Sequence, residues 1–258
     1  MRPLDSTAPV RLAARNIRKA FGAVSVLDDV DLALHAGRVT AVLGPNGSGK
    51  TTLNKILLGL VRPDRGTVLL DGQDVTGTDG YRRRIGYMPQ APRFPDNLSA
   101  RDVLALVQSL RPAQPSALEE AISRFDLGAY VDRPLGVCSG GQRQRVNAAV
   151  AMLFAPDVLI LDEPTAGLDP VASAALKDRI ADERAAGRAI LITSHVLSEL
   201  EALTDDVVLL LEGRVHYAGT REALCEATGE ASLERCIAEL LRREQRRQAA
   251  ARTTREAA

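Results

Sequence analysis

Apolar and polar positions follow two different patterns along the chain. Two early segments, Val10 to Phe21 and Val24 to Leu34, alternate apolar and polar residues, which predicts antiparallel strands joined by a short turn. Three later runs, at 158–161, 189–193 and 207–211, are apolar except for Thr193 at the end of the second, as expected of strands buried on both faces of a parallel sheet. Segments with helical spacing separate these runs. The pattern predicts an α/β fold with an antiparallel β subdomain beside a parallel core.

The stretch from about residue 91 to 140 is mostly helical. Ser99 is placed as an N-cap, and the apolar residues that follow it lie on one helical face. We expect this insert to form a helical lobe, with the core made of 10–90 and 141–225. Apolar residues nearly vanish after 241, so 226–258 is predicted to be a C-terminal helix and a basic tail.

Composition narrows the function classes. Lys and Arg number 33, as do Asp and Glu, so no net charge favours nucleic acid or an acidic membrane. No uncharged apolar run approaches the roughly 18 residues of a membrane span, and the polar opening lacks the apolar segment of an export signal. Cys138, Cys225 and Cys236 form no closely spaced metal-type pair. A reduced cytosolic setting is therefore expected.

The strongest chemical motif is a glycine-rich turn between an apolar strand and a helix. Its residues are Gly44, Pro45, Asn46, Gly47, Ser48, Gly49, Lys50, Thr51 and Thr52. The glycines let backbone N–H groups point at one anion, and the helix start adds the positive end of its dipole. Lys50 can reach the terminal phosphates of a nucleoside triphosphate, and the Thr51 hydroxyl is placed to ligate Mg²⁺. The alternative, a tight turn without a ligand, is disfavoured by the flanking strand and helix.

A second motif places two acids after the apolar run at 158–161. These acids are Asp162 and Glu163. Ligands of open α/β sheets bind at the carboxyl ends of the strands. We therefore expect Asp162 to hold Mg²⁺ through water beside Thr51, and Glu163 to polarise the water that attacks the γ-phosphate. A solvated acidic turn is the alternative.

A short glycine-containing stretch lies some twenty residues before these acids. Its residues are Cys138, Ser139, Gly140, Gly141 and Gln142. The stretch resembles the signature loop of ATP-binding cassette (ABC) ATPases, a family that usually has leucine at the position of Cys138. We interpret Cys138 as apolar packing, with sensitivity to oxidation as the alternative.

Further family markers occur in the matching order between about 10 and 225. Gln90 resembles the loop glutamine that senses Mg²⁺ and water, and His195 resembles the switch histidine that contacts the γ-phosphate. Asp169 lies in a stretch that resembles the loop joining two nucleotide sites. Phe21 stands where the family has an aromatic residue that stacks on adenine. Taken singly, these residues have bland alternatives: a surface glutamine, a structural histidine and a core phenylalanine.

The resemblance implies a P-loop NTPase with a RecA-like core that uses ATP and Mg²⁺. It further implies that two copies of the chain form a homodimer around two ATP molecules, with Ser139 completing the site of the other copy. An integral membrane permease is the expected second partner, which would place the chain peripherally on the cytoplasmic face of the inner membrane. A soluble mechanical ATPase is the alternative, although the long coiled-coil insertions or second cassettes of such proteins are missing from this sequence.

Three stretches narrow the resemblance to one group of exporter-type cassettes. These are Arg145 to Phe154, Asp169 to Ser173 and Thr228 to Glu234. They are similar to the ATPase subunit of the transporter that serves maturation of copper-dependent nitrous oxide reductase, which implies a periplasmic accessory protein as a further partner. A generic exporter of drugs, lipids or polysaccharides is the alternative. Phe94 is expected to line a groove for a cytoplasmic helix of the permease, or otherwise to pack within its own lobe.

Overall fold

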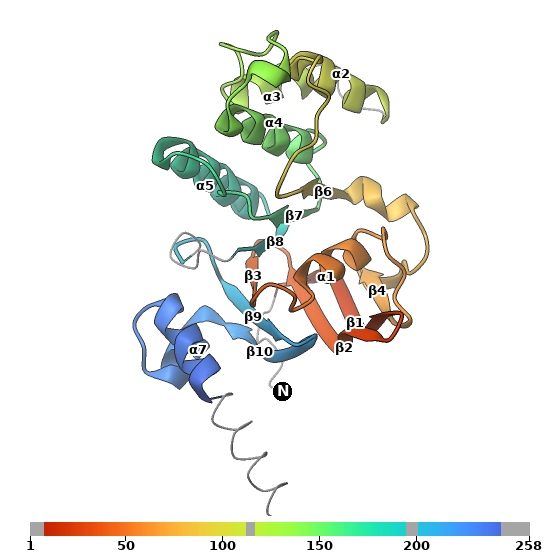
Figure 1. Ribbon diagram of the computed structural model, residues 1–258, viewed down its shortest axis with the longest axis vertical. Coiled ribbons are helices and arrows are strands. Elements are labelled where there is room, and N and C mark those ends of the chain that lie inside the picture. The colour runs from red at the N-terminus through yellow and green to blue at the C-terminus, as the bar shows by residue number, and fades with distance from the viewer. Residues whose placement is uncertain (1–7, 112–116, 195–200, 244–258) are drawn as a thin grey trace, which may run out of the picture.

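The computed structural model describes residues 8–111, 117–194 and 201–243. Figure 1 shows a helical lobe at one end of the molecule, a parallel sheet in the middle, and a smaller antiparallel sheet beside the first helix. The predicted fold class, an α/β P-loop NTPase with these subdomains, agrees with this arrangement.

A six-stranded sheet in the order β10-β9-β3-β8-β7-β6 forms the core. Its strands are β3 (Val39–Leu43), β6 (Ile85–Met88), β7 (Val158–Asp162), β8 (Ala189–Thr193), β9 (Asp206–Leu211) and β10 (Arg214–Thr220). All neighbours pair in parallel except β10, which pairs antiparallel with β9. Every residue of β3, β8 and β9 is buried, as their uninterrupted apolar runs predicted. The parallel arrangement brings the carboxyl ends of five strands to one edge.

A four-stranded antiparallel sheet in the order β2-β1-β4-β5 flanks this core. Its strands are β1 (Val10–Phe21), β2 (Val24–His35), β4 (Arg65–Leu70) and β5 (Gln73–Asp74). The predicted hairpin is confirmed, since Phe21 pairs with Val24 across the turn.

The helices connect the strands and build the lobe. They are α1 (Lys50–Leu57), α2 (Ala100–Ser109), α3 (Ala117–Arg124), α4 (Gly140–Met152), α5 (Pro170–Ala185), α7 (Arg221–Thr228), two short 3₁₀ helices (Gly80–Arg84 and Leu135–Val137), and a terminal helical segment whose described part spans 233–243. Ser99 caps α2 in a capping box with Asp102, as its position predicted. Within the described ranges, every helix is too short or too polar to cross a membrane.

Two of the domain limits expected from sequence fall at or inside helices. α4, which begins at the expected limit of 140, packs against β6 of the core and also against α2 and α3 of the helical lobe (Figure 1). The expected boundary at residue 225 falls inside α7.

The parallel sheet separates two apolar clusters. On β3, Val39 and Leu43 belong to the cluster shared with the helical lobe, whereas Val42 belongs to the cluster under the antiparallel sheet. The second cluster also holds Leu53 and Ile56 of α1, which are almost fully buried. Truncating either side chain to alanine should cost about 2–5 kcal/mol. This packing fixes α1, and with it the glycine-rich turn, between the two sheets.

Candidate functional site

The glycine-rich turn packs closely against the backbone of β9 at Gly44 and is open to solvent at Gly47. A Cβ atom on Gly44 would lie 2.1 Å from the carbonyl oxygen of Leu210, so only glycine fits there. Gly47 has a φ of 81° and would place a Cβ in open space, so its glycine serves the backbone conformation. The loop therefore presents an accessible concave backbone next to the start of α1.

Polar groups of this loop are arranged to bind an anion. α1 begins after Gly49 without a side-chain cap, which leaves the N–H groups of its first turn available for a ligand. The Ser48 hydroxyl is buried, with 2% of the residue exposed, and has no hydrogen-bond partner among the described atoms. A phosphate group would satisfy such donors, so the loop fits a nucleotide.

Lys50 lies folded over the loop. Its Nζ donates hydrogen bonds to the carbonyl oxygens of Gly44 at 2.6 Å and Pro45 at 2.9 Å. Burial lowers the pKa of Lys50, while the charges of Glu163 and Asp162 act in the opposite direction. Lys50 and Asp162 are 112 residues apart in the sequence. In the fold, the two acids are close enough for their charges to act on the Lys50 ammonium.

Strand pairing holds the two acids in place. Asp162 is opposite Thr193 in the β7–β8 pair, and the Thr193 hydroxyl donates a short hydrogen bond to the Asp162 carboxylate. The backbone N–H of Glu163 donates to the Thr193 carbonyl at 2.9 Å. Glu163 has a φ of 51°, an uncommon backbone conformation for this residue type. Hydrogen bonds to β8 therefore hold Asp162 and Glu163 in place at the end of β7.

Two amides of α4 bind the ends of core strands. The Gln144 amide donates to the carbonyl oxygen of Pro164 at 3.1 Å, next to Glu163. The Asn147 amide donates to the carbonyl oxygen of Pro89 at 2.8 Å, next to Gln90. Neither residue was identified from the sequence. The available signal was a pair of amides one helical turn apart, next to the apolar residues Val146, Ala148 and Ala149.

The signature-like stretch forms the N-terminus of α4. The Ser139 hydroxyl accepts from the backbone N–H of Gln142 at 3.2 Å, and the Gln142 side chain accepts from the N–H of Ser139 at 2.9 Å. Ser139 and Gly140 are exposed at this helix start. Cys138 is half-buried against the core, in agreement with a packing role. The capping box thus presents a helix N-terminus to the outside of the molecule.

Comparisons with known proteins agree with this geometry. The family model described as ABC transporter matches residues 27–166. The chain belongs to the ABC transporter family. It is 35% identical to the lantibiotic transport ATP-binding protein SrtF of Streptococcus pyogenes over 79% of this chain and 88% of that protein. It is 36% identical to the lipopolysaccharide export system ATP-binding protein LptB of Acidithiobacillus ferridurans, over 83% and 92%.

A solved structure described as an ATP binding subunit of an ABC transporter has the same fold. It superposes with a TM-score of 0.83 at 31% identity and covers 90% of this chain and 99% of that chain. The chain is therefore an ATP-binding ABC ATPase whose hydrolysis is coupled to transport.

The remaining family markers lie at exposed or partly buried positions of this ABC cassette. Phe21 is 53% exposed, which excludes the alternative that it is a core residue. Gln90 is exposed, two residues beyond the end of β6. Asp169 caps α5 by accepting from the N–H of Ala172 at 2.9 Å. His195 lies outside the described residues, directly after Ser194.

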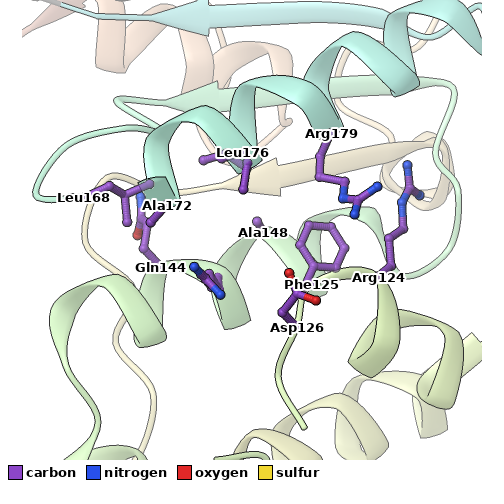
Figure 2. A pocket seen from close by; sticks show the side chains of 11 residues that line it. Arg124, Phe125, Asp126, Gln144, Ala148, Leu168, Ala172, Leu176 and Arg179 are labelled. Atoms are coloured by element: carbon purple, nitrogen blue, oxygen red, sulfur yellow. The ribbon is translucent and has the colours of Figure 1, made fainter. Parts of the chain in front are cut away.

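A small pocket lies between α5 and the helical lobe (Figure 2). The side chains of Phe125, Ala148 and Leu176 meet there, with Arg124 and Arg179 at one side. Its volume of about 20 Å³ has room for water and not for a nucleotide. The cavity is therefore a packing gap between lobe and core, separate from the glycine-rich turn.

Proposed function

We propose that the chain is the ATPase subunit of a transporter that serves maturation of copper-dependent nitrous oxide reductase. The observation that supports ATP hydrolysis by this chain is that Lys50 lies near Asp162 and Glu163 at one edge of the parallel sheet. The cargo assignment is supported by the resemblance of three stretches to that transporter's ATPase, at 145–154, 169–173 and 228–234.

The chain's own residues supply most of the hydrolytic chemistry. The backbone of the glycine-rich turn, Ser48 and Lys50 bind the phosphates of ATP, and Phe21 stacks on the adenine. Glu163 accepts a proton from the attacking water, while Gln90 and His195 position that water and the γ-phosphate. Thr51, Gln90 and, through a water, Asp162 would hold Mg²⁺, which would supply positive charge beside the phosphates.

A second copy of the chain completes each nucleotide site. Figure 1 shows α4 in the helical lobe, well away from α1 and its glycine-rich turn. The start of α4, where Ser139 and Gly140 are exposed and Gly141 is half-buried, is therefore suited to an ATP bound by another protomer. Asp169 is exposed at the start of α5. In such a dimer we expect it to lie in the loop that connects the two nucleotide sites.

A groove between core and lobe is suited to the membrane permease. Two neighbouring hollows of about 250 and 440 Å³ share Arg82 of the core and Arg111 of the lobe. Leu60 and Leu110, both exposed, add apolar surface to them. Apolar residues flanked by arginines fit a short amphipathic helix with acidic groups. Phe94 instead packs half-buried against the core cluster, as the alternative interpretation of this residue held.

This assembly would sit on the cytoplasmic face of the inner membrane, with a periplasmic accessory protein on the other side. A second candidate is a generic exporter. It is favoured by the names of the relatives, which include lantibiotic transport, Nod factor export, lipopolysaccharide export and doxorubicin resistance proteins.

Deletion and complementation in the host bacterium test the cargo assignment. Without the chain, the nitrous oxide reductase should be made but lack its copper-site absorption and its activity, while another periplasmic copper enzyme stays active. Wild-type chain should restore the reductase, and the variant Glu163→Gln should not. A fully active reductase in the deletion strain would refute the assignment and favour the generic exporter.

A further inference from the structure

Two cysteines far from the nucleotide site lie in direct contact. Cys225 belongs to α7, and Cys236 belongs to the following helical segment. The Cys236 thiol donates a hydrogen bond to the sulfur of Cys225, with the two Sγ atoms 3.2 Å apart. Both are free thiols. Gly229, with a φ of 72° at the end of α7, turns the chain so that the second helix folds back on the first.

The two thiols differ in exposure. Cys236 is fully buried, together with Leu233 and Ile237 of the same helix, whereas Cys225 is half-buried. A small oxidant from solvent therefore meets Cys225 first, with Cys236 already in place behind it. This is the arrangement of an attacked thiol and a resolving thiol.

We propose that Cys225 and Cys236 form a disulfide under oxidising conditions and so join α7 to the terminal helix. The sulfur atoms of a disulfide are about 2.05 Å apart, so closure requires a movement of roughly 1.2 Å from the thiol contact. Among the residues that the structure describes, no cluster of three or more metal-ligating side chains occurs, which favours a covalent bridge over a metal site.

The chemistry balances with a peroxide as the oxidant. The Cys225 sulfur attacks one oxygen of hydrogen peroxide, which breaks the O–O bond and gives a sulfenic acid and one water. The Cys236 sulfur then attacks the Cys225 sulfur, which expels the hydroxyl as a second water after protonation. The two thiols lose two electrons and two protons, and the peroxide is reduced to two waters.

Cys225 is a protonated thiol at neutral pH. Burial and the contact with the neighbouring Cys236 thiol raise the pKa of Cys225 to about 11, so few thiolates are present to react. Bridge formation is therefore slow, and sustained rather than brief exposure to oxidant is needed.

The bridge would make α7 and the terminal helix less mobile around Glu201, which hydrogen-bonds to both. The backbone N–H of Leu233 donates to the Glu201 carboxylate at 3.1 Å. The Arg221 side chain, at the start of α7, donates to the Glu201 carbonyl oxygen at 3.2 Å. Closing a loop of this size lowers local opening by a factor on the order of 100. Oxidation would thus lock the C-terminal helices around Glu201.

Peptide mapping tests the bridge directly. Trypsin cleaves after Arg221, Arg235 and Arg242, so the two cysteines lie on separate peptides, 222–235 and 236–242. The full-length chain is incubated with hydrogen peroxide, alkylated and digested without reductant. We expect a linked pair of these peptides, lighter than their sum by two hydrogen atoms, that is separated by dithiothreitol. Hydrogen exchange within 236–242 should slow by a factor on the order of 100.

Two variants serve as controls. Cys138→Ser removes the third thiol and should leave the linked pair unchanged. Cys225→Ser should abolish the linked pair and the slower exchange, with Cys236 recovered as the alkylated peptide. The proposal is overturned if peroxide leaves Cys225 as sulfinic acid beside a free Cys236. It is equally overturned if mixed light and heavy-isotope chains show the bridge to form between two molecules.

Discussion

The Asn147 side-chain amide donates a 2.8 Å hydrogen bond to the carbonyl oxygen of Pro89. Asn147 lies on α4, whose first residue follows Ser139, and Pro89 directly precedes Gln90. One bond therefore joins the helix that begins at the signature-like stretch to the segment that carries Gln90. If the helical lobe rotates relative to the core, the bond either moves with both segments or is broken.

Replacing Asn147 with leucine should destabilise the chain and impair coupling. The substitution is similar in size but leaves the Pro89 carbonyl oxygen without its buried donor, at a cost of about 1–3 kcal/mol. Urea denaturation measures the change in the free energy of unfolding. Asn147→Asp, which keeps the shape but removes the donor, should show a loss at least as large. Unchanged stability in both variants would show that the bond contributes nothing to joining helix and strand.

Glu163→Gln should bind ATP but hydrolyse it about 10²- to 10⁴-fold more slowly, since a general base in this position is removed. Glutamine has to adopt the same positive φ of 51°, so the folding cost of the backbone is unchanged. Phosphate release measures hydrolysis, and size-exclusion chromatography with ATP should show a trapped dimer. Glu212→Gln, at an exposed acid that also has a positive φ, is the matched control. Near wild-type turnover of the Glu163 variant would remove this residue from the role of base.

Ser139→Arg should leave ATP binding intact and prevent closure of the dimer, because Ser139 lies at the exposed start of α4. Lys50→Ala should instead lose ATP affinity, since the ammonium that contacts the phosphates is missing. In an equal mixture of the two variants, about a quarter of the sites pair an intact loop with an intact signature. Hydrolysis should therefore partly recover. Loss of binding in Ser139→Arg as severe as in Lys50→Ala would mean that the signature acts within its own chain.

Leu110→Glu should abolish capture of the membrane permease without affecting the fold. Leu110 is 74% exposed at the groove between core and lobe, so an added charge costs little stability but disfavours an apolar partner. Detergent-solubilised permease is captured on immobilised chain without nucleotide, and thermal unfolding checks the fold. Val24→Glu, an exposed valine on the distant β-hairpin, should capture normally. Equal capture by both variants would place the permease on another surface.

Stability should fall in weak acid because of His35. The residue is 4% exposed, and burial lowers its pKa below the ordinary value of 6.5, with Asp206 and Arg38 acting in opposite directions. The unfolded chain therefore takes up a proton that the folded chain refuses. Stability is complete above pH 6.5 and falls as the pH drops below it, by up to about 1.4 kcal/mol per pH unit until the folded pKa is reached.

Denaturant titrations at pH 8 and pH 5.5 measure this effect. His35→Leu should reduce the difference in the free energy of unfolding between the two pH values. His216→Gln, at an exposed histidine on β10, should not reduce it. The assignment to His35 fails if its replacement leaves the pH dependence unchanged.

Much of the local structure follows from signals that act within a few residues. The Ser99 cap, the hairpin between Phe21 and Val24, and the strand, glycine-rich turn and helix around Gly49 were all predicted from sequence and are present. Hydrogen bonds between a side chain and its own helix, and positive φ at glycine, require no distant partner. Such features therefore survive in any fold that contains the segment.

The place of α4 could not be predicted in the same way. Its residues from Val146 to Ala149 are buried without interruption, so the helix has no single apolar face that indicates one partner. The sequence pattern placed it with the core; the structure packs it against the core strand β6 and also against α2 of the lobe. The amides of Gln144 and Asn147 are buried because carbonyl oxygens of distant prolines accept from them.

The sequence by itself determined the family, the phosphate-binding loop and the pair of acids, because these are short motifs whose chemistry depends on residue type and spacing. Tertiary structure alone decided that β3 lies between β8 and β9, which brings Lys50 to Asp162 and Glu163. It also decided that Cys225 and Cys236 touch. The physical reason is that the local sequence of a uniformly apolar strand, or around a buried thiol, does not specify which distant segment will contact it. Their pairing depends on which distant surfaces the whole chain can bury together.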